Sequence, residues 1–258
     1  MSDRLRQTLS IAVGFTLFLV ALAVLRVELR ATSWHELTTD VIGTPLPQLG
    51  LAFALTALNY VALTGYDLLA FSNIGKVLPR ARVALASYLA YAISNSVGGA
   101  MPFGASVRYR FYTRWGVTAT ELARIVFSCS VTFWLGLFAL GGLSFIVSAL
   151  TSARELPARW VLLCGGSLLM LTPAGYLLAT VLRKKPIRVG TFELPLPSPK
   201  IAFSQTLLSV IEWTLAGAVL YVLLPPSPLS FLAFLGAFLM AILIGMASHV
   251  PGGVGVFE

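Results

Sequence analysis

The chain has 258 residues, of which 57% are hydrophobic and only 11% are charged, and its mean hydropathy is +0.87. A globule of this length in water needs more polar surface, so the composition excludes a soluble domain and indicates a polytopic membrane protein. The 18 Lys and Arg outnumber the 10 Asp and Glu and fall mostly in short loops between apolar runs. That placement favours membrane topology and affinity for anionic lipid over nucleic-acid binding.

The first uncharged run, 7–25, is long enough to cross a hydrocarbon core, which needs about 20 helical residues. Basic residues precede it as in a signal peptide, but the apolar stretch is long and no small-residue cleavage pattern follows. We therefore expect a retained anchor with a cytoplasmic N-terminus. Residues 26–48 then form an external loop, and a second span at about 49–71 returns the chain to the cytoplasm.

The segment 94–110 begins in an apolar run and ends in an arginine cluster, with small, polar and helix-breaking residues between. The residues that we expect to form its turns are Gly98, Gly99, Pro102 and Gly104. Non-helical backbone at membrane depth leaves peptide groups unsatisfied unless protein or a water-filled cavity surrounds it. The segment therefore predicts a hairpin over 83–116 that enters the membrane, turns back and lines a site.

Charge placement distinguishes this hairpin from a single crossing of residues 83–107. With a single crossing, seven of the 18 basic residues are cytoplasmic and eleven external, which inverts the positive-inside rule. With the hairpin, fourteen are cytoplasmic and four external. The apolar part, 83–93, also spans only about 16 Å as a helix, about half of a bilayer. We favour the hairpin; the alternative is a full span whose polar residues pack against neighbouring helices.

Further spans follow from this topology. They are 125–150 outward, 160–182 inward, 201–224 outward and a last apolar run at 229–246, with a basic, proline-containing cytoplasmic loop at 183–200. The predicted fold is an all-α polytopic membrane protein with about six transmembrane helices and one or two re-entrant broken-helix hairpins.

The end of the chain repeats features of the 94–110 segment. A serine, then Pro251, Gly252 and Gly253, and then another glycine and Glu258 follow the last apolar run. If the two segments are related, 229–258 is a second re-entrant hairpin that enters from outside, and the chain is an inverted repeat. The alternative is that glycine and proline are common in membrane helices. Because no tail follows, we expect the single domain, 1–258, to be a fragment of a longer protein.

Three charged residues are predicted to lie in membrane segments. Asp67 falls about two turns from the cytoplasmic end of the second span, and Glu212 lies about 16 Å along its helix, near the bilayer centre. A charge there costs at least about 2.5–3.5 kcal/mol on insertion scales, so it persists with a partner or a water path. We predict that Asp67, Arg108 and Glu212 line one polar cavity, where Arg108 holds a lipid phosphate and the acids attract a cationic head group or pair with Arg108.

Two simpler interpretations remain open: a purely structural ion pair, and an Asp67 side chain that reaches the membrane surface. Asn95 and Arg110 complete the predicted set of head-group residues. For Arg110 and the nearby Arg114, the alternative is a role in topology or in contacts to anionic lipid at the interface.

Two cysteines and two histidines are scattered without metal-ligand spacing or a disulfide framework. A Ser/His/Asp set, paired histidines and a glycine-rich phosphate loop with a lysine are also missing from the sequence. We therefore expect no metal, no cofactor and no catalytic residue in this segment.

Spaced motifs run through nearly the whole chain. They are Asn59-Tyr60, Thr64-Gly65-Tyr66-Asp67, Tyr91-Ala92-Ile93-Ser94-Asn95 before Gly98-Gly99, Arg108-Tyr109-Arg110-Phe111-Tyr112 with Trp115-Gly116 after it, Glu212-Trp213 and Pro251-Gly252-Gly253. Together they resemble the N-terminal membrane region of the multiple peptide resistance factor (MprF) family, the bacterial lysyl-phosphatidylglycerol synthase/flippases.

This resemblance implies an inner-membrane flippase region, further spans, and a cytosolic domain that transfers an aminoacyl group, typically lysyl, from tRNA to phosphatidylglycerol. It implies that the product, moved outward, lowers surface negative charge and repels cationic antimicrobial peptides. The intramembrane acid, arginine and glutamate of the family fall on Asp67, Arg108 and Glu212. The synthase domain is absent here, so phosphatidylglycerol lysyltransferase activity and binding of aminoacyl-tRNA would belong to a longer parent protein. Related stand-alone membrane proteins share this region without the synthase.

The predicted function is translocation of aminoacylated (lysyl) phosphatidylglycerol from the inner to the outer leaflet of the bacterial cytoplasmic membrane. The expected partners are anionic and aminoacylated phospholipids and further copies of the chain. The alternatives are a stand-alone lipid transporter of the same superfamily, an intramembrane lipid-modifying enzyme that uses Glu212 or Asp67 as a general base, and a transporter of small solutes or ions. A lipid-modifying enzyme would consume its lipid, whereas a flippase redistributes it unchanged.

Overall fold

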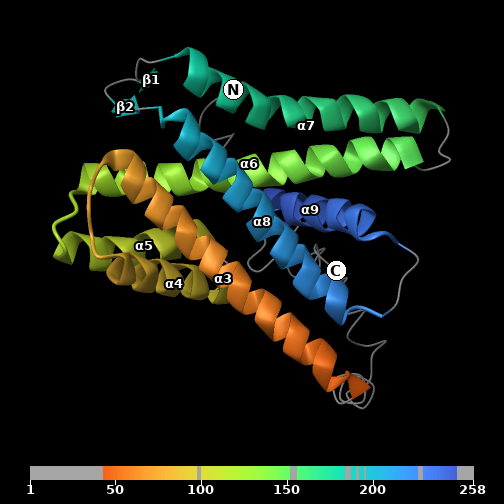
Figure 1. Cartoon of the computed structure of the whole chain (residues 1–258), viewed down its shortest axis with the longest axis horizontal. Coiled ribbons are helices and arrows are strands. Elements are labelled where there is room, and N and C mark those ends of the chain that lie inside the picture. Colours follow the sequence, from red (N-terminus) through yellow and green to blue (C-terminus); the bar gives the residue numbers. More distant parts are fainter. Residues whose placement is uncertain are drawn as a thin grey trace, which may run out of the picture.

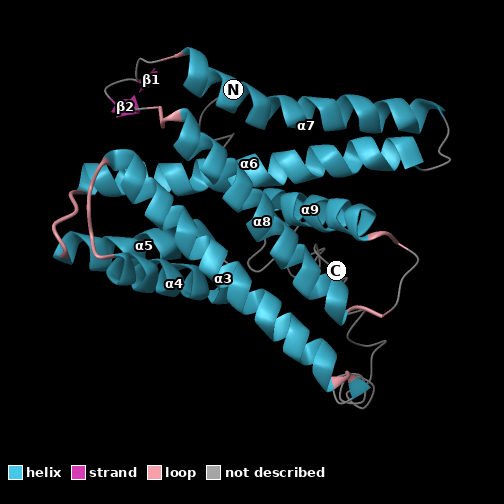
Figure 2. Ribbon diagram, in the orientation of Figure 1, coloured by secondary structure: helices cyan, strands magenta, loops and turns pink. Residues whose placement is uncertain are grey.

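The computed structural model describes residues 43–97, 100–151, 156–183, 187–189, 192–194, 196–225 and 229–248. These residues form helices and one small two-stranded sheet (Figures 1 and 2). The elements are α3 (Leu46–Ile74), α4 (Arg80–Val97), α5 (Ala100–Arg114), α6 (Ala119–Thr151), α7 (Leu156–Leu182), β1 (Ile187–Val189), β2 (Phe192–Leu194), α8 (Pro199–Leu223) and α9 (Phe231–Ser248).

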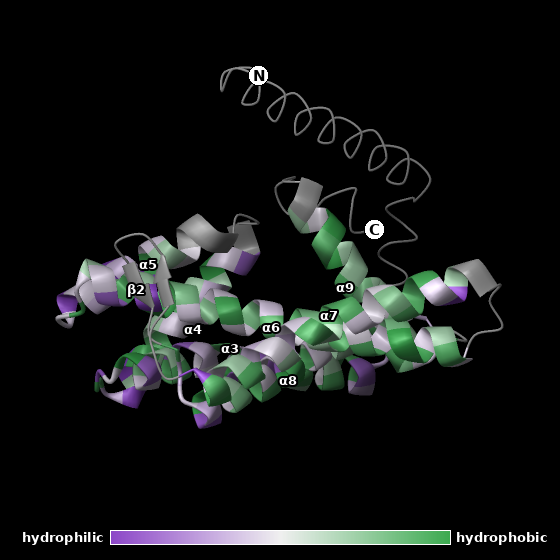
Figure 3. Cartoon of the chain, turned by 90° about the horizontal axis from the view of Figure 1, so that it is seen from above, coloured by the Kyte–Doolittle hydropathy of each residue, from purple (hydrophilic) through white to green (hydrophobic). Residues whose placement is uncertain are grey.

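Four of these helices, α3, α6, α7 and α8, are long and apolar enough to cross a membrane, and α9 contains a shorter apolar stretch, Phe231–Met246. Hydrophobic residues cover the middle of the long helices, and hydrophilic residues gather toward the end of the molecule that carries β2 (Figure 3). The structure thus confirms an all-α polytopic membrane protein. The predicted span 7–25 and the turn at 251–253 lie outside the described residues.

Helix α6 is the common partner of the bundle. It packs against α3, α5, α7, α8 and α9, and α8 crosses over it to pack along α3 (Figure 1). Small residues permit the closest crossings: a Cβ at Gly142 of α6 would lie 2.7 Å from the Gly166 carbonyl oxygen of α7. Close backbone approach through small residues is a usual way for helices to associate in lipid, where hydrophobic burial supplies little driving force.

Helices α4 and α5 form an antiparallel helical hairpin over the predicted segment. The start of α5 meets the end of α4, since Gly104 lies against Ser94 and Ala90. The end of α5 meets the start of α4, where the Tyr112 hydroxyl lies 3.5 Å from the Val83 carbonyl oxygen. Both outer ends of the hairpin lie where α3 ends and α6 begins (Figure 1). How deeply the hairpin enters the bilayer stays a prediction.

The irregular part of the 94–110 segment is much shorter than expected. Helix α4 continues to Val97 and α5 begins at Ala100, so only Gly98 and Gly99 separate the two helices, and both are outside the described residues. Pro102 is the third residue of α5. A proline in the first helical turn removes no intrahelical hydrogen bond, because those N–H groups have no partner inside the helix. The proline therefore marks a helix start instead of a break.

The loops at the hairpin's outer ends are tightly organised. Gly75 after α3 and Gly116 after α5 have positive φ. Each of these two helices ends with a pair of backbone hydrogen bonds typical of a Schellman motif. Thr118 and Glu121 then exchange the two bonds of a capping box at the start of α6. Lys76 connects all three features, because its Nζ donates to the Gly116 carbonyl (2.6 Å) and to Glu121 Oε2 (2.5 Å).

The segment 183–200 contains a short β-hairpin that we did not predict. Strands β1 and β2 pair antiparallel with Ile187 opposite Leu194 and Val189 opposite Phe192. Strands of three residues are too short to produce a detectable alternation of polar and apolar residues, and the surrounding prolines and basic residues read as a loop.

Candidate functional site

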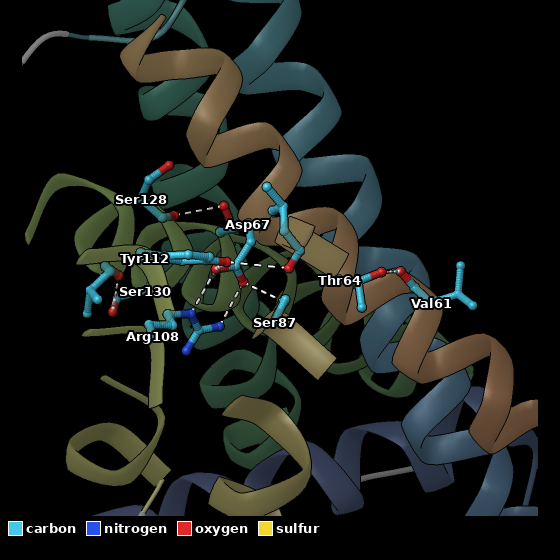
Figure 4. A network of polar contacts seen from close by, with 11 residues as sticks. Val61, Thr64, Asp67, Ser87, Arg108, Tyr112, Ser128 and Ser130 are labelled. Carbon is cyan, nitrogen blue, oxygen red and sulfur yellow. Dashed lines mark hydrogen bonds and ion pairs between the residues drawn. The ribbon is translucent and has the colours of Figure 1, made fainter. Parts of the chain in front are cut away.

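The carboxylate of Asp67 is the centre of a buried polar cluster between α3, α4 and α5. It lies two turns before the end of α3 and is 0% exposed, and Arg108 is 6% exposed. Asp67 Oδ1 accepts from Arg108 Nε and from the Tyr112 hydroxyl, both at 2.8 Å. Asp67 Oδ2 accepts from Arg108 Nη2 at 2.8 Å and from the Ser87 hydroxyl at 2.6 Å. Figure 4 shows these four side chains converging.

This arrangement satisfies a charge that would otherwise be costly. The guanidinium and carboxylate meet in the bidentate geometry that is strongest for this pair, and two hydroxyls complete the carboxylate's bonding. The Arg108 guanidinium also lies over the Tyr91 ring, 4.5 Å from its centroid, at the distance of a cation–π contact. Removal of one partner from such a buried pair leaves an uncompensated charge, which is strongly destabilising.

The local sequence explains why these groups meet. Arg108 and Tyr112 are four residues apart on α5, so they project from one face of that helix. On α3, Phe71 lies one turn after Asp67 and packs edge-on against Tyr112, with ring centroids 5.0 Å apart. The ion pair thus fixes the hairpin to a spanning helix.

A second polar cluster surrounds Glu212, which is 6% exposed near the middle of the 25-residue helix α8. Glu212 Oε2 accepts from the Tyr66 hydroxyl at 3.1 Å, and Oε1 lies 3.4 Å from Asn59 Nδ2. The Asn59 amide also donates to the Glu212 backbone carbonyl at 2.8 Å. The Tyr66 hydroxyl is also 3.0 Å from Ser209 Oγ. Both side chains that bond to this carboxylate are therefore neutral.

The two clusters adjoin each other without merging. Tyr66 and Asp67 are consecutive on α3, and the Tyr91 ring that lies under Arg108 packs edge-on against Tyr66, with centroids 6.2 Å apart. The structure brings Asp67 and Arg108 together as an ion pair, which was one of the arrangements that we considered. Glu212 bonds to Asn59 and Tyr66 instead of Arg108.

The remaining predicted site residues are placed as follows. Gly104 is buried against Ser94. A Cβ placed on Gly104 would lie 3.2 Å from Arg108 Nη1. A larger residue would therefore push on the ion pair. Asn95 on α4 and Arg110 on α5 are exposed, so neither contributes to the buried clusters. Gly98, Gly99, Pro251, Gly252 and Gly253 lie outside the described residues.

An apolar groove of about 550 Å³ runs between α3 and α4. None of the three charged residues lines it, and Tyr60 and Tyr88 meet across it with ring centroids 5.3 Å apart. In the part of the chain that the structure describes, no group of three His, Cys, Asp or Glu side chains is arranged to hold a metal ion.

Several partners in the clusters were not predicted from the sequence. We quoted Asn59, Tyr66 and Tyr112 only within motifs and did not consider Ser87 or Ser209. All five are polar residues, and Asn59, Tyr66 and Ser209 lie in the long apolar helices α3 and α8. For those three the composition was a usable signal, because polar side chains in membrane helices usually face the protein interior. The same signal identifies a further network in which Tyr176 donates to Gln205 (2.6 Å) and Gln205 to Ser128 (2.9 Å), linking α7, α8 and α6.

Comparison with known proteins agrees with this architecture. Uncharacterized protein slr0712 of Synechocystis sp. is 36% identical over 99% of this chain and 80% of its own length. Inner membrane protein YbhN of Escherichia coli is 30% identical over 93% of this chain and 76% of its own. Phosphatidylglycerol lysyltransferase of Staphylococcus aureus is 24% identical over the whole chain, which covers 30% of that enzyme.

The family described as the lysylphosphatidylglycerol synthase TM region matches residues 8–258, nearly the whole sequence. This match covers all the described helices, including both polar clusters. It confirms the resemblance that the spaced motifs indicated and makes the chain a lipid-related membrane domain. The chain therefore belongs to the family of the lysylphosphatidylglycerol synthase transmembrane region.

Proposed function

We propose that this chain translocates a phospholipid with a cationic or zwitterionic head group, of the aminoacylated phosphatidylglycerol class, from the inner to the outer leaflet of the bacterial cytoplasmic membrane. The main support for this proposal is the buried bidentate ion pair of Asp67 and Arg108, which joins helix α3 to the α4–α5 hairpin. A charge pair in such a position is costly to bury and commonly marks a substrate path.

The chemistry of the pair fits such a head group. An aminoacylated phosphatidylglycerol carries a phosphate and at least one ammonium group. As the lipid enters, its phosphate bonds to Arg108 and its ammonium to Asp67, so two intermolecular pairs replace the internal one. Glu212 on α8, which accepts from Tyr66, the residue before Asp67 on α3, supplies a second acceptor for ammonium. Opening the Asp67–Arg108 pair also removes the charged attachment of the hairpin to α3, which would ease the movement that transport requires.

The names of two relatives support the choice of lipid class and membrane in this proposal. The Staphylococcus aureus relative is by name a phosphatidylglycerol lysyltransferase, and YbhN is by name an inner membrane protein. This chain covers only 30% of the lysyltransferase, so the proposal concerns movement of the lipid and not its synthesis. Outward movement of the product would make the cell surface less negative and so reduce its attraction for cationic antimicrobial peptides.

The test is reconstitution of the full chain into liposomes that contain lysyl-phosphatidylglycerol in the inner leaflet. Amine labelling with a membrane-impermeant reagent then measures its appearance outside. We expect the wild type to raise the rate of exposure. The double variant Asp67→Asn with Arg108→Gln, which leaves no charge of the pair unbalanced, should lower that rate at least tenfold. The matched control is Arg80→Gln, which removes an exposed arginine at the start of α4. Equal exposure with and without protein would overturn the proposal, as would conversion of the lipid to another species.

A further inference from the structure

The Tyr66 hydroxyl has one hydrogen and two acceptors. It lies 3.0 Å from Ser209 Oγ and 3.1 Å from Glu212 Oε2. A phenol donates only one hydrogen bond, so it serves one of these oxygens at a time. While Glu212 is a carboxylate it can only accept, and the Tyr66 hydrogen points to it. When Glu212 is a carboxylic acid, it can donate to the phenol oxygen, and the Tyr66 hydrogen turns to Ser209.

Ser209 is held ready to accept that hydrogen. It lies one turn before Glu212 on α8, and its Oγ is 3.0 Å from the Gly136 backbone N–H and 3.4 Å from the Phe133 carbonyl oxygen on α6. A Cβ at Gly136 would lie 2.1 Å from Ser209 Oγ, so only glycine leaves room for the hydroxyl. Both hydrogen-bond arrangements are therefore complete without movement of the helices.

No basic side chain balances Glu212 among the described residues that bond to it. A carboxylate with neutral donors alone in the middle of a spanning helix loses its hydration without an ion pair to offset the loss, and such carboxylates typically take part in proton transfer. The titratable or charged neighbours on the packed helices are Tyr66 in contact, Cys129 in the same buried cluster as Tyr66, Asp67 matched by Arg108, and Tyr176 bonded to Gln205. The described residues of α9 carry no titratable side chain.

We propose that Glu212 is a proton-binding site, and that proton binding there alternates with binding of the ammonium group of the lipid. The carboxylate takes a proton from hydronium in the aqueous phase and leaves water, the Tyr66 hydrogen turns from Glu212 to Ser209, and the neutral acid no longer attracts an ammonium. Release of the proton restores the acceptor. Lipid translocation is then linked to a pH gradient. The alternation with lipid rests on the proposed function, whereas proton binding by Glu212 does not.

Infrared difference spectroscopy of the full chain in phosphatidylglycerol vesicles tests proton binding by itself. A pH step should produce a carboxylic-acid carbonyl band that is absent from Glu212→Gln and present in Lys200→Gln, a control that removes an exposed charge at the start of the same helix. Tyr66→Phe should keep the band at a shifted frequency, because the acid loses its phenol partner. If the band persists in Glu212→Gln, or is absent in both the wild type and Tyr66→Phe, the proton site is wrong.

Amine labelling of lysyl-phosphatidylglycerol in the same vesicles under an imposed pH gradient tests the alternation. We expect the rate of lipid exposure with the wild type to change at least threefold when the direction of the gradient is reversed. With Glu212→Gln the rate should not depend on the gradient. A wild-type rate that is insensitive to the gradient would overturn the alternation. If the infrared band titrates but no lipid moves in any variant, the proposed translocation fails while the proton site stands.

Discussion

The Asp67 and Glu212 clusters bury an acid in the same membrane domain by different means. Asp67 has a full counter-charge in Arg108 and two hydroxyl donors, and its four bonds join three helices. Glu212 has an amide and a phenol and no counter-charge among its described contacts. The first arrangement pairs the acid with a positive charge, whereas the second surrounds it with neutral donors.

The two clusters should also differ in how much stability is lost when one partner is removed. Loss of one member of a buried ion pair leaves a bare charge, which costs more than loss of a single hydrogen bond to a group that can become neutral. We therefore expect loss of the Asp67 counter-charge to affect folding first. Loss of a single donor to Glu212 should cost less stability than loss of Arg108, and it should alter transport and its pH dependence.

The largest effect should come from breaking the charged cluster. Arg108→Gln leaves Asp67 buried without its counter-charge, and we expect a loss of about 3–5 kcal/mol in stability. The measurement is the thermal unfolding midpoint of the purified protein in detergent, followed by tryptophan fluorescence. The double variant Asp67→Asn with Arg108→Gln should recover part of the loss, because no charge remains. A single-variant midpoint equal to that of Arg80→Gln would show that the pair does not hold the fold.

The phenols of the two clusters offer a direct contrast. Tyr66→Phe removes a bond to a carboxylate that has only one other side-chain donor, and we expect a loss of about 1.5–3 kcal/mol. Tyr112→Phe also removes a bond to a carboxylate, but Asp67 keeps three of its four bonds, so the loss should fall at the lower end of that range, about 1.5 kcal/mol. The same unfolding assay ranks the two variants. If Tyr112→Phe proves the more damaging, the Glu212 cluster is the better satisfied one.

The close approach of α6 and α8 at Gly136 and Ser209 can be tested next to the Glu212 cluster. Gly136→Ala places a Cβ 2.1 Å from Ser209 Oγ and 2.5 Å from its backbone carbon. Overpacking of this kind costs about 1–3 kcal/mol, and the shift of Ser209 should also weaken the gradient response of transport. Gly175→Ala in α7 is the control, since nothing lies within 4 Å of its Cβ. Equal midpoints for the two variants would mean that the helices separate at little cost.

The smallest effect should come from the loops that join the hairpin to the bundle. Lys76→Ala removes a partly exposed ion pair with Glu121 and a bond to the Gly116 carbonyl. Such pairs contribute less than about 1 kcal/mol and are screened by salt. Unfolding midpoints of wild type and variant should therefore converge at high salt. A loss comparable to that of Arg108→Gln would make the loop as important as the buried pair.

The sequence was sufficient for the helices and for the identity of the charged residues. Long uncharged runs located α3, α6, α7 and α8 because a bilayer requires a minimum apolar length. The rarity of charge in such runs singled out Asp67 and Glu212. Charge counting favoured a hairpin at 83–116, and the structure has an antiparallel helix pair there, although its position in the bilayer remains to be tested.

The geometry between helices could not be derived in this way. Whether Arg108 pairs with Asp67 or with Glu212 depends on the rotation of three helices, and a single sequence does not encode that rotation in any local pattern. The same limit concealed Ser209, whose importance arises from the contact with Gly136 across 73 residues of chain. We expected Gly98, Gly99, Pro102 and Gly104 to form the turns of the segment, whereas Pro102 and Gly104 lie within α5 and only two residues separate α4 from α5.

The adjacency of Tyr66 and Asp67 gives α3 two anchoring points on different sides. Consecutive helical residues project about 100° apart around the axis, so Asp67 fixes α3 to the hairpin while Tyr66 fixes it to α8. Two attachments at different angles set the rotational position of a rod as well as its distance from its neighbours. Helix α3 therefore cannot turn about its own axis without lengthening bonds on at least one side, and any rotation during transport must begin with the release of one of them.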